Sequence, residues 1–353
     1  MLAAGAAAGG PGGRPHARRT GAAGRLADRP GGSASVKRRD TLRSLAGLAA
    51  VGLAGRAGAV AQPTEKAPAV PGPDPHPRTP RFRMPPRACD AHAHIFGPDD
   101  KYPYSPSRSY TPPEAPLADF QALHAALGIE RCVLVNATLH GFDNRVVTDA
   151  IAQSGGRYRG VANVNDGMTP QDLQRLDEAG IRACRFAFLK RLGGVADRAA
   201  FERIAQRVAA LDWHIVVYLD SESVAAMRPL LQQLPVPYLI DHMGTVNAAQ
   251  GLDGANVKAL LALQREDPKC WVKISGPDRV SATGAPYLDA VPIAQALIEN
   301  APDRVVWGTD WPHPNLKVMP NDGDLVDLVP LYAPDAALRQ KLLVDNPARL
   351  YRF

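Results

Sequence analysis

Short apolar runs alternate with amphipathic stretches along most of this chain, and this alternation restricts the fold more than any other feature. Each run has the length of a strand, and the stretches between runs have apolar residues three and four apart, as in a helix with one buried face. The eight runs are Ala88–Phe96, Cys132–Ala137, Gly160–Val164, Ala183–Phe188, Ile215–Leu219, Pro237–Asp241, Trp271–Ser275 and Val305–Trp307. The helical stretches include Leu117–Leu127, Asp172–Ala179, Phe201–Leu211, Val224–Leu234, Val257–Gln264 and Ile293–Asn300. Strands that each precede a helix predict an α/β fold, a (β/α)8 TIM barrel with parallel strands.

An open, doubly wound parallel sheet is the alternative that the same alternation permits. That fold normally places a glycine-rich phosphate-binding turn directly after its first strand. Here the first run leads instead into His94-Ile95-Phe96-Gly97-Pro98. The sequence of this turn therefore favours the barrel.

Two polar clusters lie at opposite ends of the alternating pattern. In the first run, Asp90, His92 and His94 are two residues apart, so a regular strand would place them on one face. After the last run, Val305–Trp307, Asp310 opens a loop. Burying a carboxylate beside an apolar strand costs free energy unless it is paired or used. A lone Asp would more often cap its own loop, but the histidine pair on the first strand favours a functional site.

The barrel also predicts where the polar side chains meet, because the C-terminal ends of all its strands open on one mouth. Besides the residues of these two clusters, the strand ends and the loops after them contribute Asn136, Thr138, Arg185, Lys190, Arg191, Tyr218, Asp220, Asp241, His242, Lys273, Ser275, Arg279, His313 and Asn315, with Tyr104, Arg108 and Tyr110 on the first loop. Three arginines at one mouth, Arg185, Arg191 and Arg279, are better suited to bind carboxylates through paired hydrogen bonds than to remain solvated.

The first 86 residues do not fit the barrel pattern. Residues 1–35 are mainly Ala, Gly, Arg and Pro and have too few large apolar side chains to bury a core, so we interpret them as a disordered or mis-annotated extension. Residues 36–61 combine paired arginines, a short apolar run and a small-x-small site, which is typical of a twin-arginine signal peptide. A disordered basic tail is the alternative. Residues 62–86 are rich in proline and are interpreted as a linker, and the barrel is expected at 87–353.

This signal peptide predicts export to the periplasm. Its apolar run is too short to span a bilayer, so no stable membrane anchor is expected after cleavage. Residues 1–61 contain 10 Lys or Arg and 2 Asp or Glu, so, of a net charge of +6, the rest of the chain carries −2. No basic stripe with interleaved aromatic residues occurs, and nucleic acid is not an expected partner. The cysteines match neither a zinc knuckle nor a disulfide framework, so we expect four buried free thiols: Cys89, Cys132, Cys184 and Cys270.

Three motifs resemble those of the amidohydrolase superfamily: His-Ala-His at 92–94, Asp-His-Met-Gly at 241–244 and Gly-Thr-Asp-Trp-Pro-His-Pro-Asn at 308–315. Within that superfamily, the chain resembles the lactonases that act on 2-pyrone-4,6-dicarboxylate, from about Cys89 to the C-terminus. The narrower likeness includes residues 109–112, 140–145, 188–192, 278–284 and 342–351. The three motifs are specific to the superfamily, and the Arg and Tyr set is more specific to the lactonase group.

The resemblance implies a role for each matched residue. Asp310 is the general base that takes a proton from the attacking water. The residues matched to polarisation of the lactone carbonyl and stabilisation of the oxyanion are His92, His94 and His242. Those matched to substrate binding are Arg185, Arg191, Arg279, Tyr110, Tyr218 and Thr138. These roles suit the chemistry, because ester hydrolysis needs an activated water and a stabilised oxyanion, and an anionic substrate needs cations that do not titrate.

The resemblance leaves open whether the enzyme uses a metal ion. Metal-dependent members of the superfamily add a His at the end of the fifth strand, or a Lys or Glu at the fourth, whereas here the fifth run ends Val-Tyr-Leu-Asp at 217–220. Arginines beside the site would repel a cation, so we expect catalysis without a metal or another cofactor. The alternative is a single zinc ion held by His92, His94, His242 and Asp310.

Two departures from the lactonase group leave the substrate open, namely the export signal and the small side chain of Ala187. The alternative enzyme is a related sugar-acid or sulfomuconolactone hydrolase or isomerase. From another class, a non-catalytic periplasmic barrel that binds dicarboxylates would keep the arginines and lose the base or the histidines, which are all present here. The expected partner is a small anionic lactone, and the protein is expected to be a monomer or a small homo-oligomer.

Overall fold

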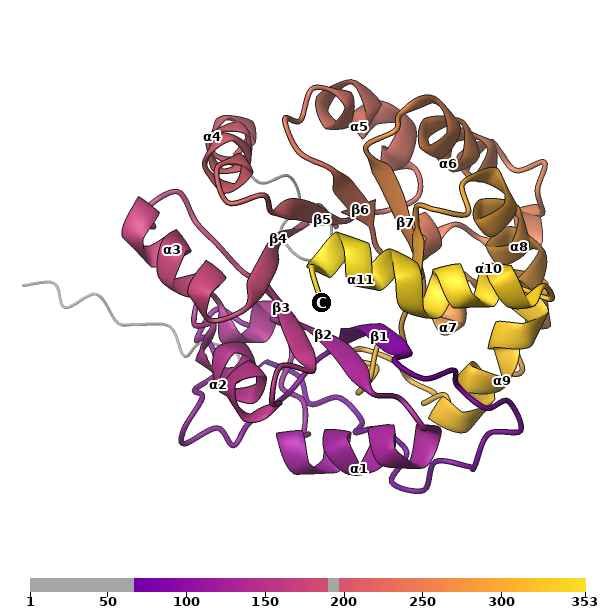
Figure 1. Cartoon of the computed structure of the whole chain (residues 1–353), viewed down its shortest axis with the longest axis horizontal. Coiled ribbons are helices and arrows are strands. Elements are labelled where there is room, and N and C mark those ends of the chain that lie inside the picture. The colour runs from indigo at the N-terminus through magenta and orange to yellow at the C-terminus, as the bar shows by residue number, and fades with distance from the viewer. Residues whose placement is uncertain (1–66, 190–196) are drawn as a thin grey trace, which may run out of the picture. The chain divides into compact units, whose positions relative to one another are not determined.

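The computed structural model describes residues 67–189 and 197–353, and within these ranges eight parallel strands pair in the order of the sequence (Figure 1). The strands are β1 (Cys89–Ala93), β2 (Arg131–Val135), β3 (Tyr158–Ala162), β4 (Ile181–Ala187), β5 (His214–Tyr218), β6 (Tyr238–Ile240), β7 (Cys270–Ile274) and β8 (Val305–Trp307). Each predicted apolar run overlaps one of these strands, so the (β/α)8 TIM-barrel fold is confirmed.

Helices surround the ring of strands. They are α1 (Leu117–Leu127), α2 (Arg145–Gln153), α3 (Pro170–Glu178), α4 (Arg198–Ala209), α5 (Ser223–Gln232), α6 (Ala255–Glu266), α7 (Pro277–Val280), α8 (Val291–Asn300), α9 (Asp322–Tyr332), α10 (Ala336–Gln340) and α11 (Asn346–Tyr351). Among the described residues, no helix combines the length and the hydropathy that crossing a membrane requires. The four cysteines are buried free thiols, as predicted.

The ring is completed where β1 meets the segment that follows β8. Ala93 forms a parallel bridge with Trp311, and the backbone N–H of His94 donates to the carbonyl of Trp311 at 2.7 Å. A Cβ at Gly308 would lie 2.6 Å from the backbone nitrogen of His92, so only glycine allows the two strands to approach this closely. This contact brings the histidine motif and the Asp310 loop together.

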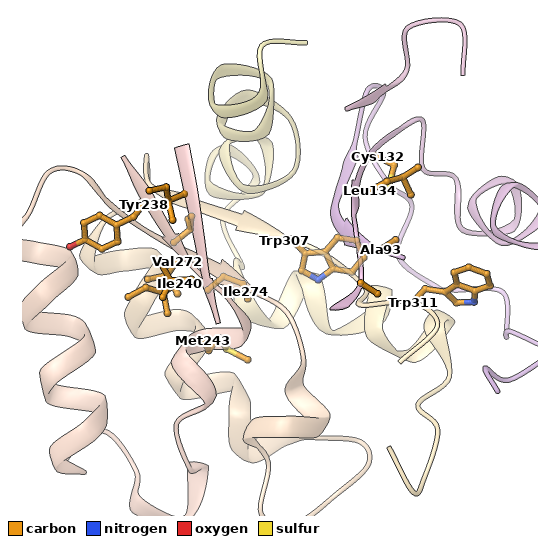
Figure 2. Packing of buried hydrophobic residues seen from close by; sticks show 14 of the residues in the cluster. Ala93, Cys132, Leu134, Tyr238, Ile240, Met243, Val272, Ile274, Trp307 and Trp311 are labelled. Carbon is orange, nitrogen blue, oxygen red and sulfur yellow. The ribbon is translucent and has the colours of Figure 1, made fainter. Parts of the chain in front are cut away.

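Alternate strand residues supply two apolar layers. The outer layer packs between strands and helices, and Figure 2 shows part of it, including Tyr238 and Ile240 of β6 and Val272 and Ile274 of β7. The inner layer fills the lower barrel with Cys89, Ala91, Val133, Val135, Val161, Ala183, Val216, Leu239, Trp271 and Val306, and Tyr351 of α11 packs against it. In Figure 1, α11 crosses the middle of the ring, so it covers one end of the barrel and leaves the other for the polar side chains.

The described part of the proline-rich segment lies against the barrel. Ala69 forms a bridge with Thr111, directly after Tyr110. The backbone N–H groups of Arg81 and Phe82 donate to Asp327 of α9 at 2.7 and 2.9 Å. This segment therefore packs against the loop that carries Thr111 and against α9. The predicted extension at 1–35 and signal peptide at 36–61 lie outside the described residues.

Candidate active site

Asp310 stands at the centre of the mouth and its two carboxylate oxygens face different partners. Its Oδ1 lies 3.4 Å from Nε2 of His92, 3.4 Å from Nε2 of His94 and 3.9 Å from Nε2 of His242. Its Oδ2 accepts hydrogen bonds from Nε and Nη2 of Arg279 at 3.0 and 2.6 Å. The backbone of Asp310 has φ 70°, a left-handed conformation that non-glycine residues seldom adopt outside functional sites. The loop therefore aims this carboxylate at the histidines, as predicted.

The His-Ala-His motif presents both of its rings to Asp310. The Nε2 atoms of His92 and His94 are 3.3 Å apart, and Nδ1 of His94 lies 2.7 Å from the carbonyl of Val135. Because a carbonyl only accepts, His94 donates from Nδ1, and its Nε2 faces the pocket. Nδ1 of His242 lies 3.0 Å from the hydroxyl of Ser275, which fixes the third ring.

The prediction that Asp90 shares the face of the histidines is wrong. Its carboxylate accepts hydrogen bonds from the N–H and hydroxyl of Thr309 at 3.0 and 2.6 Å, and it also lies 3.3 Å from Nε2 of His124. The pairing register of β1 shifts between Asp90 and Ala93, and this irregularity breaks the period-two alternation. The hydrogen bonds of Asp90 therefore link β1 to the start of the loop that carries Asp310, away from the face that the histidines share.

A second charged layer lies beneath the histidines. Asp241 accepts a hydrogen bond from Nε of Arg185 at 2.8 Å, and its Oδ1 lies 2.9 Å from Nζ of Lys273. The same Nζ lies 2.9 Å from Nδ1 of His92. The sequence placed Lys273 among residues at the mouth, but its side chain is fully buried below the mouth. Its spacing of two from Trp271, which faces the barrel interior, is the signal that could have placed it there.

The charges around Asp310 keep it ionised. Burial opposes ionisation, but the guanidinium of Arg279 and the neighbouring histidines outweigh it and hold the pKa of Asp310 well below its usual range. Burial and the Lys273 charge lower the pKa of His92 to about 3, so this ring is neutral at physiological pH. Burial likewise lowers the pKa of His242 well below its ordinary value. The site thus presents a carboxylate base beside neutral imidazoles.

Five of the six predicted substrate-binding residues surround a small cavity over Asp310. Tyr110, Thr138, Arg185, Tyr218 and Arg279 line it with His94 and His242, and its volume is about 30 Å³. That space holds one or two water molecules rather than a ring-sized substrate. A larger hollow of about 670 Å³ adjoins it and shares Thr138 and Arg185. A substrate would therefore displace side chains at the junction of these two spaces.

Several residues predicted at the mouth have other partners. The amide nitrogen of Asn136 donates to Oδ1 of Asn144 at 2.8 Å, within the loop before α2. Nε2 of His313 lies 3.1 Å from Oδ1 of Asp322, away from the pocket. Lys190 and Arg191, the third arginine predicted to bind a carboxylate, lie in residues 190–196, outside the described residues.

By distance alone, the site contains groups that could hold a metal ion. Two sets of side chains have their donor atoms within 4.8 Å of one another, namely His92, His94 and Asp310, and His92, Asp241 and His242. The hydrogen bonding of His92 fits a metal ion less well than these distances do. Nζ of Lys273 lies 2.9 Å from Nδ1 of His92, and an ammonium group only donates. A neutral His92 that accepts this bond carries its proton on Nε2 and has no lone pair there for a metal.

Known proteins resemble this chain in sequence and in fold. Residues 89–353 match the Amidohydrolase family model. The chain is 45% identical over 285 residues to a 2-pyrone-4,6-dicarboxylate hydrolase of Comamonas testosteroni, covering 78% of this chain and 93% of that protein. It is 43% identical over 294 residues to a 4-sulfomuconolactone hydrolase of Hydrogenophaga intermedia, covering 82% and 97%. A crystal structure of a Pseudomonas putida protein described as a 2-pyrone-4,6-dicarboxylic acid hydrolase superposes with a TM-score of 0.66 at 27% identity, covering 76% and 98%. The chain belongs to the amidohydrolase family.

Proposed function

We propose that this protein is a lactonase that opens the ring of a lactone bearing two or three carboxylates, of the 2-pyrone-4,6-dicarboxylate class. One observation carries the proposal: the carboxylate of Asp310 lies within 3.4 Å of two histidine Nε2 atoms and shares its pocket with Arg185 and Arg279. A base, hydrogen-bonding groups for an oxyanion and fixed cations are together in one buried site. The hydrolase relatives of this chain support the same reaction class.

In the proposed reaction, Asp310 takes a proton from a water molecule as its oxygen bonds to the lactone carbonyl carbon. The carbonyl oxygen becomes an oxyanion, which the imidazole N–H of His92 and the ring of His242 stabilise from below. When the intermediate collapses, the bond from the carbonyl carbon to the ring oxygen breaks. The proton on Asp310 passes to that leaving oxygen, so the carboxylate is regenerated and one water is consumed.

The arginines explain the preference for a carboxylated lactone. Arg185 of β4 and Arg279 of α7 both line the cavity, and guanidinium groups match carboxylates in charge and shape. Arg191, from the sequence, is proposed as the third cation. A non-catalytic binding barrel would not need Asp310 and three histidines converging within 3.9 Å.

We also propose that hydrolysis needs no metal ion. The support is the hydrogen bonding of His92, whose Nδ1 faces the ammonium of Lys273, and the presence of two guanidinium groups around the pocket. In this proposal, imidazole hydrogen bonds polarise the carbonyl in place of a Lewis acid. The export of the protein to the periplasm by a twin-arginine signal at 36–61 is likewise a proposal, and fractionation of cells before and after replacement of Arg38 and Arg39 by lysine tests it.

The proposed activity is tested by adding purified protein to 2-pyrone-4,6-dicarboxylate and following the loss of pyrone absorbance. Parallel reactions contain 4-sulfomuconolactone, which the second group of relatives hydrolyses, and an uncharged δ-lactone of similar size. The proposal predicts turnover of the dicarboxylate and little turnover of the uncharged lactone. Faster turnover of 4-sulfomuconolactone than of the dicarboxylate would identify the sulfonated lactone as the better substrate. No turnover of any lactone would reject the proposed function.

A further inference from the structure

The buried lysine under the histidines has no part in the reaction proposed above. Lys273 extends from β7 into the barrel, where its side chain is 0% exposed. Its Nζ lies 2.9 Å from Oδ1 of Asp241 and 2.9 Å from Nδ1 of His92. A buried ammonium is costly unless it is paired and hydrogen-bonded, so this position indicates a specific use.

Two groups compete for Nδ1 of His92, and they demand opposite tautomers. If Nδ1 carries the proton, it donates to Asp241, whose Oδ1 is 3.4 Å away. If Nδ1 is unprotonated, it accepts from the Lys273 ammonium at 2.9 Å. The shorter contact is to the group that has no lone pair, so Nδ1 accepts and the proton of the neutral ring is on Nε2.

We propose that Lys273 is a positioning residue that holds His92 in the tautomer protonated at Nε2. That Nε2 is 3.4 Å from Oδ1 of Asp310 and 3.3 Å from Nε2 of His94, so its proton points into the site. The first consequence rests on the proposed function: His92 is a hydrogen-bond donor to the lactone carbonyl. The second does not rest on it: His92 is withdrawn from metal coordination.

Removal of Lys273 should reverse both consequences. Asp241 keeps its hydrogen bond from Arg185 and can then accept a hydrogen bond from the protonated Nδ1 of His92. A histidine oriented by a carboxylate in this way is the usual arrangement around protein-bound zinc. The Nε2 lone pair would face His94 and Asp310, whose donor atoms lie 3.3 to 3.4 Å away. Donor atoms around a tetrahedral zinc ion, at about 2.0–2.1 Å from it, have roughly this spacing.

The experiment compares the unmodified protein with Lys273→Met, which removes the ammonium and keeps the length of the side chain. Lys269→Met is the matched control, because Nζ of Lys269 bonds the carbonyls of Gln232 and Leu234 and does not contact His92. The tautomer of His92 is read from its 15N chemical shifts, assigned by comparison with His92→Gln. Zinc affinity is measured by calorimetric titration with Zn²⁺ alone, and kcat and KM are measured without added metal.

We expect the unmodified protein and Lys269→Met to show a proton on Nε2 of His92 and weak zinc binding. Lys273→Met should show the proton on Nδ1, bind zinc about 10- to 100-fold more tightly, and lose kcat with little change in KM. The added substitution His94→Gln should remove the gain in zinc affinity.

A proton on Nδ1 in the unmodified protein would overturn the proposal, as would unchanged zinc affinity in a folded Lys273→Met variant. If that variant does not fold, the tautomer in the unmodified protein decides. Neither the NMR nor the zinc measurement depends on lactonase activity, so failure of the proposed function would be seen separately in the absorbance assay.

Discussion

Replacing Arg279 by methionine should change both substrate preference and the acid limb of the pH profile. Arg279 donates two hydrogen bonds to Oδ2 of Asp310, at 3.0 and 2.6 Å, and it lines the cavity that would receive a substrate carboxylate. A hydrogen bond to a charged group contributes roughly 1.5–3 kcal/mol, so loss of the arginine should lower kcat/KM for a dicarboxylate lactone about ten- to a hundredfold. An uncharged lactone makes no such pair, so its kcat/KM should change little at a pH above the acid limb.

The pH effect follows from the second role of Arg279. Burial opposes ionisation of Asp310, and Arg279 is the principal charge that lowers its pKa. A base with a depressed pKa is active above that pKa and loses activity as the pH falls through it, so the unmodified enzyme should keep its activity into acid. In Arg279→Met the pKa of Asp310 rises, and the acid limb should move to higher pH.

Arg185→Met is the matched control, because Arg185 bonds Asp241 and not Asp310. It should weaken use of the dicarboxylate and leave the acid limb in place. The assay is steady-state kinetics on charged and uncharged lactones from about pH 4 to 9, with thermal unfolding to confirm that both variants are folded. If the ratio of kcat/KM for the dicarboxylate lactone to that for the uncharged lactone is unchanged in both variants, the arginines do not bind the substrate carboxylates. If the acid limb does not move in Arg279→Met, Arg279 does not set the pKa of Asp310.

Three further predictions concern stability and cofactor use. Asp90→Ala should lower the free energy of unfolding by about 3–5 kcal/mol in urea titrations, because it leaves the buried donors of Thr309 and the backbone N–H of His92 without their acceptor; a loss under 1 kcal/mol would contradict this. Burial lowers the pKa of His214 to about 3, so as the pH falls the unfolded state binds a proton at this residue before the folded state does. The free energy of unfolding should therefore fall by roughly 1.4 kcal/mol per pH unit between about pH 6.5 and pH 3. His214→Gln should reduce the slope of unfolding free energy against pH by that amount. Chelation of divalent ions should leave lactone hydrolysis intact, and restoration of lost activity by zinc would contradict the proposed metal independence.

The sequence predicted the barrel well because its signal is repeated eight times. An error of one or two residues at a boundary, as between Ile215–Leu219 and β5, does not change the order of the strands. The position of Asp310 and the three histidines followed from the barrel itself, because the ends of parallel strands converge. These features depend on topology, which a single sequence encodes strongly.

The remaining features depend on side-chain contacts that alternation does not encode. Asp90 was misplaced because the register shift in β1 lies between it and Ala93, and nothing in the residue types signals that shift. The engagement of Arg279 with Asp310 and of Arg185 with Asp241 was not foreseen, because sequence identifies cations but not their partners. Lys273 was expected at the mouth; its spacing of two from Trp271 indicates an inward side chain, but its contact with His92 emerges only from the three-dimensional packing.

In the proposed reaction, Asp310 activates water for attack on a carboxylated lactone. The most direct test is the kcat of Asp310→Asn on 2-pyrone-4,6-dicarboxylate, followed by pyrone absorbance, since asparagine keeps the shape of the side chain and an oxygen that can accept from Arg279. We expect a kcat at least about a hundredfold below that of the unmodified enzyme, with a similar KM and a folded variant. A folded Asp310→Asn protein with near-normal turnover would contradict it.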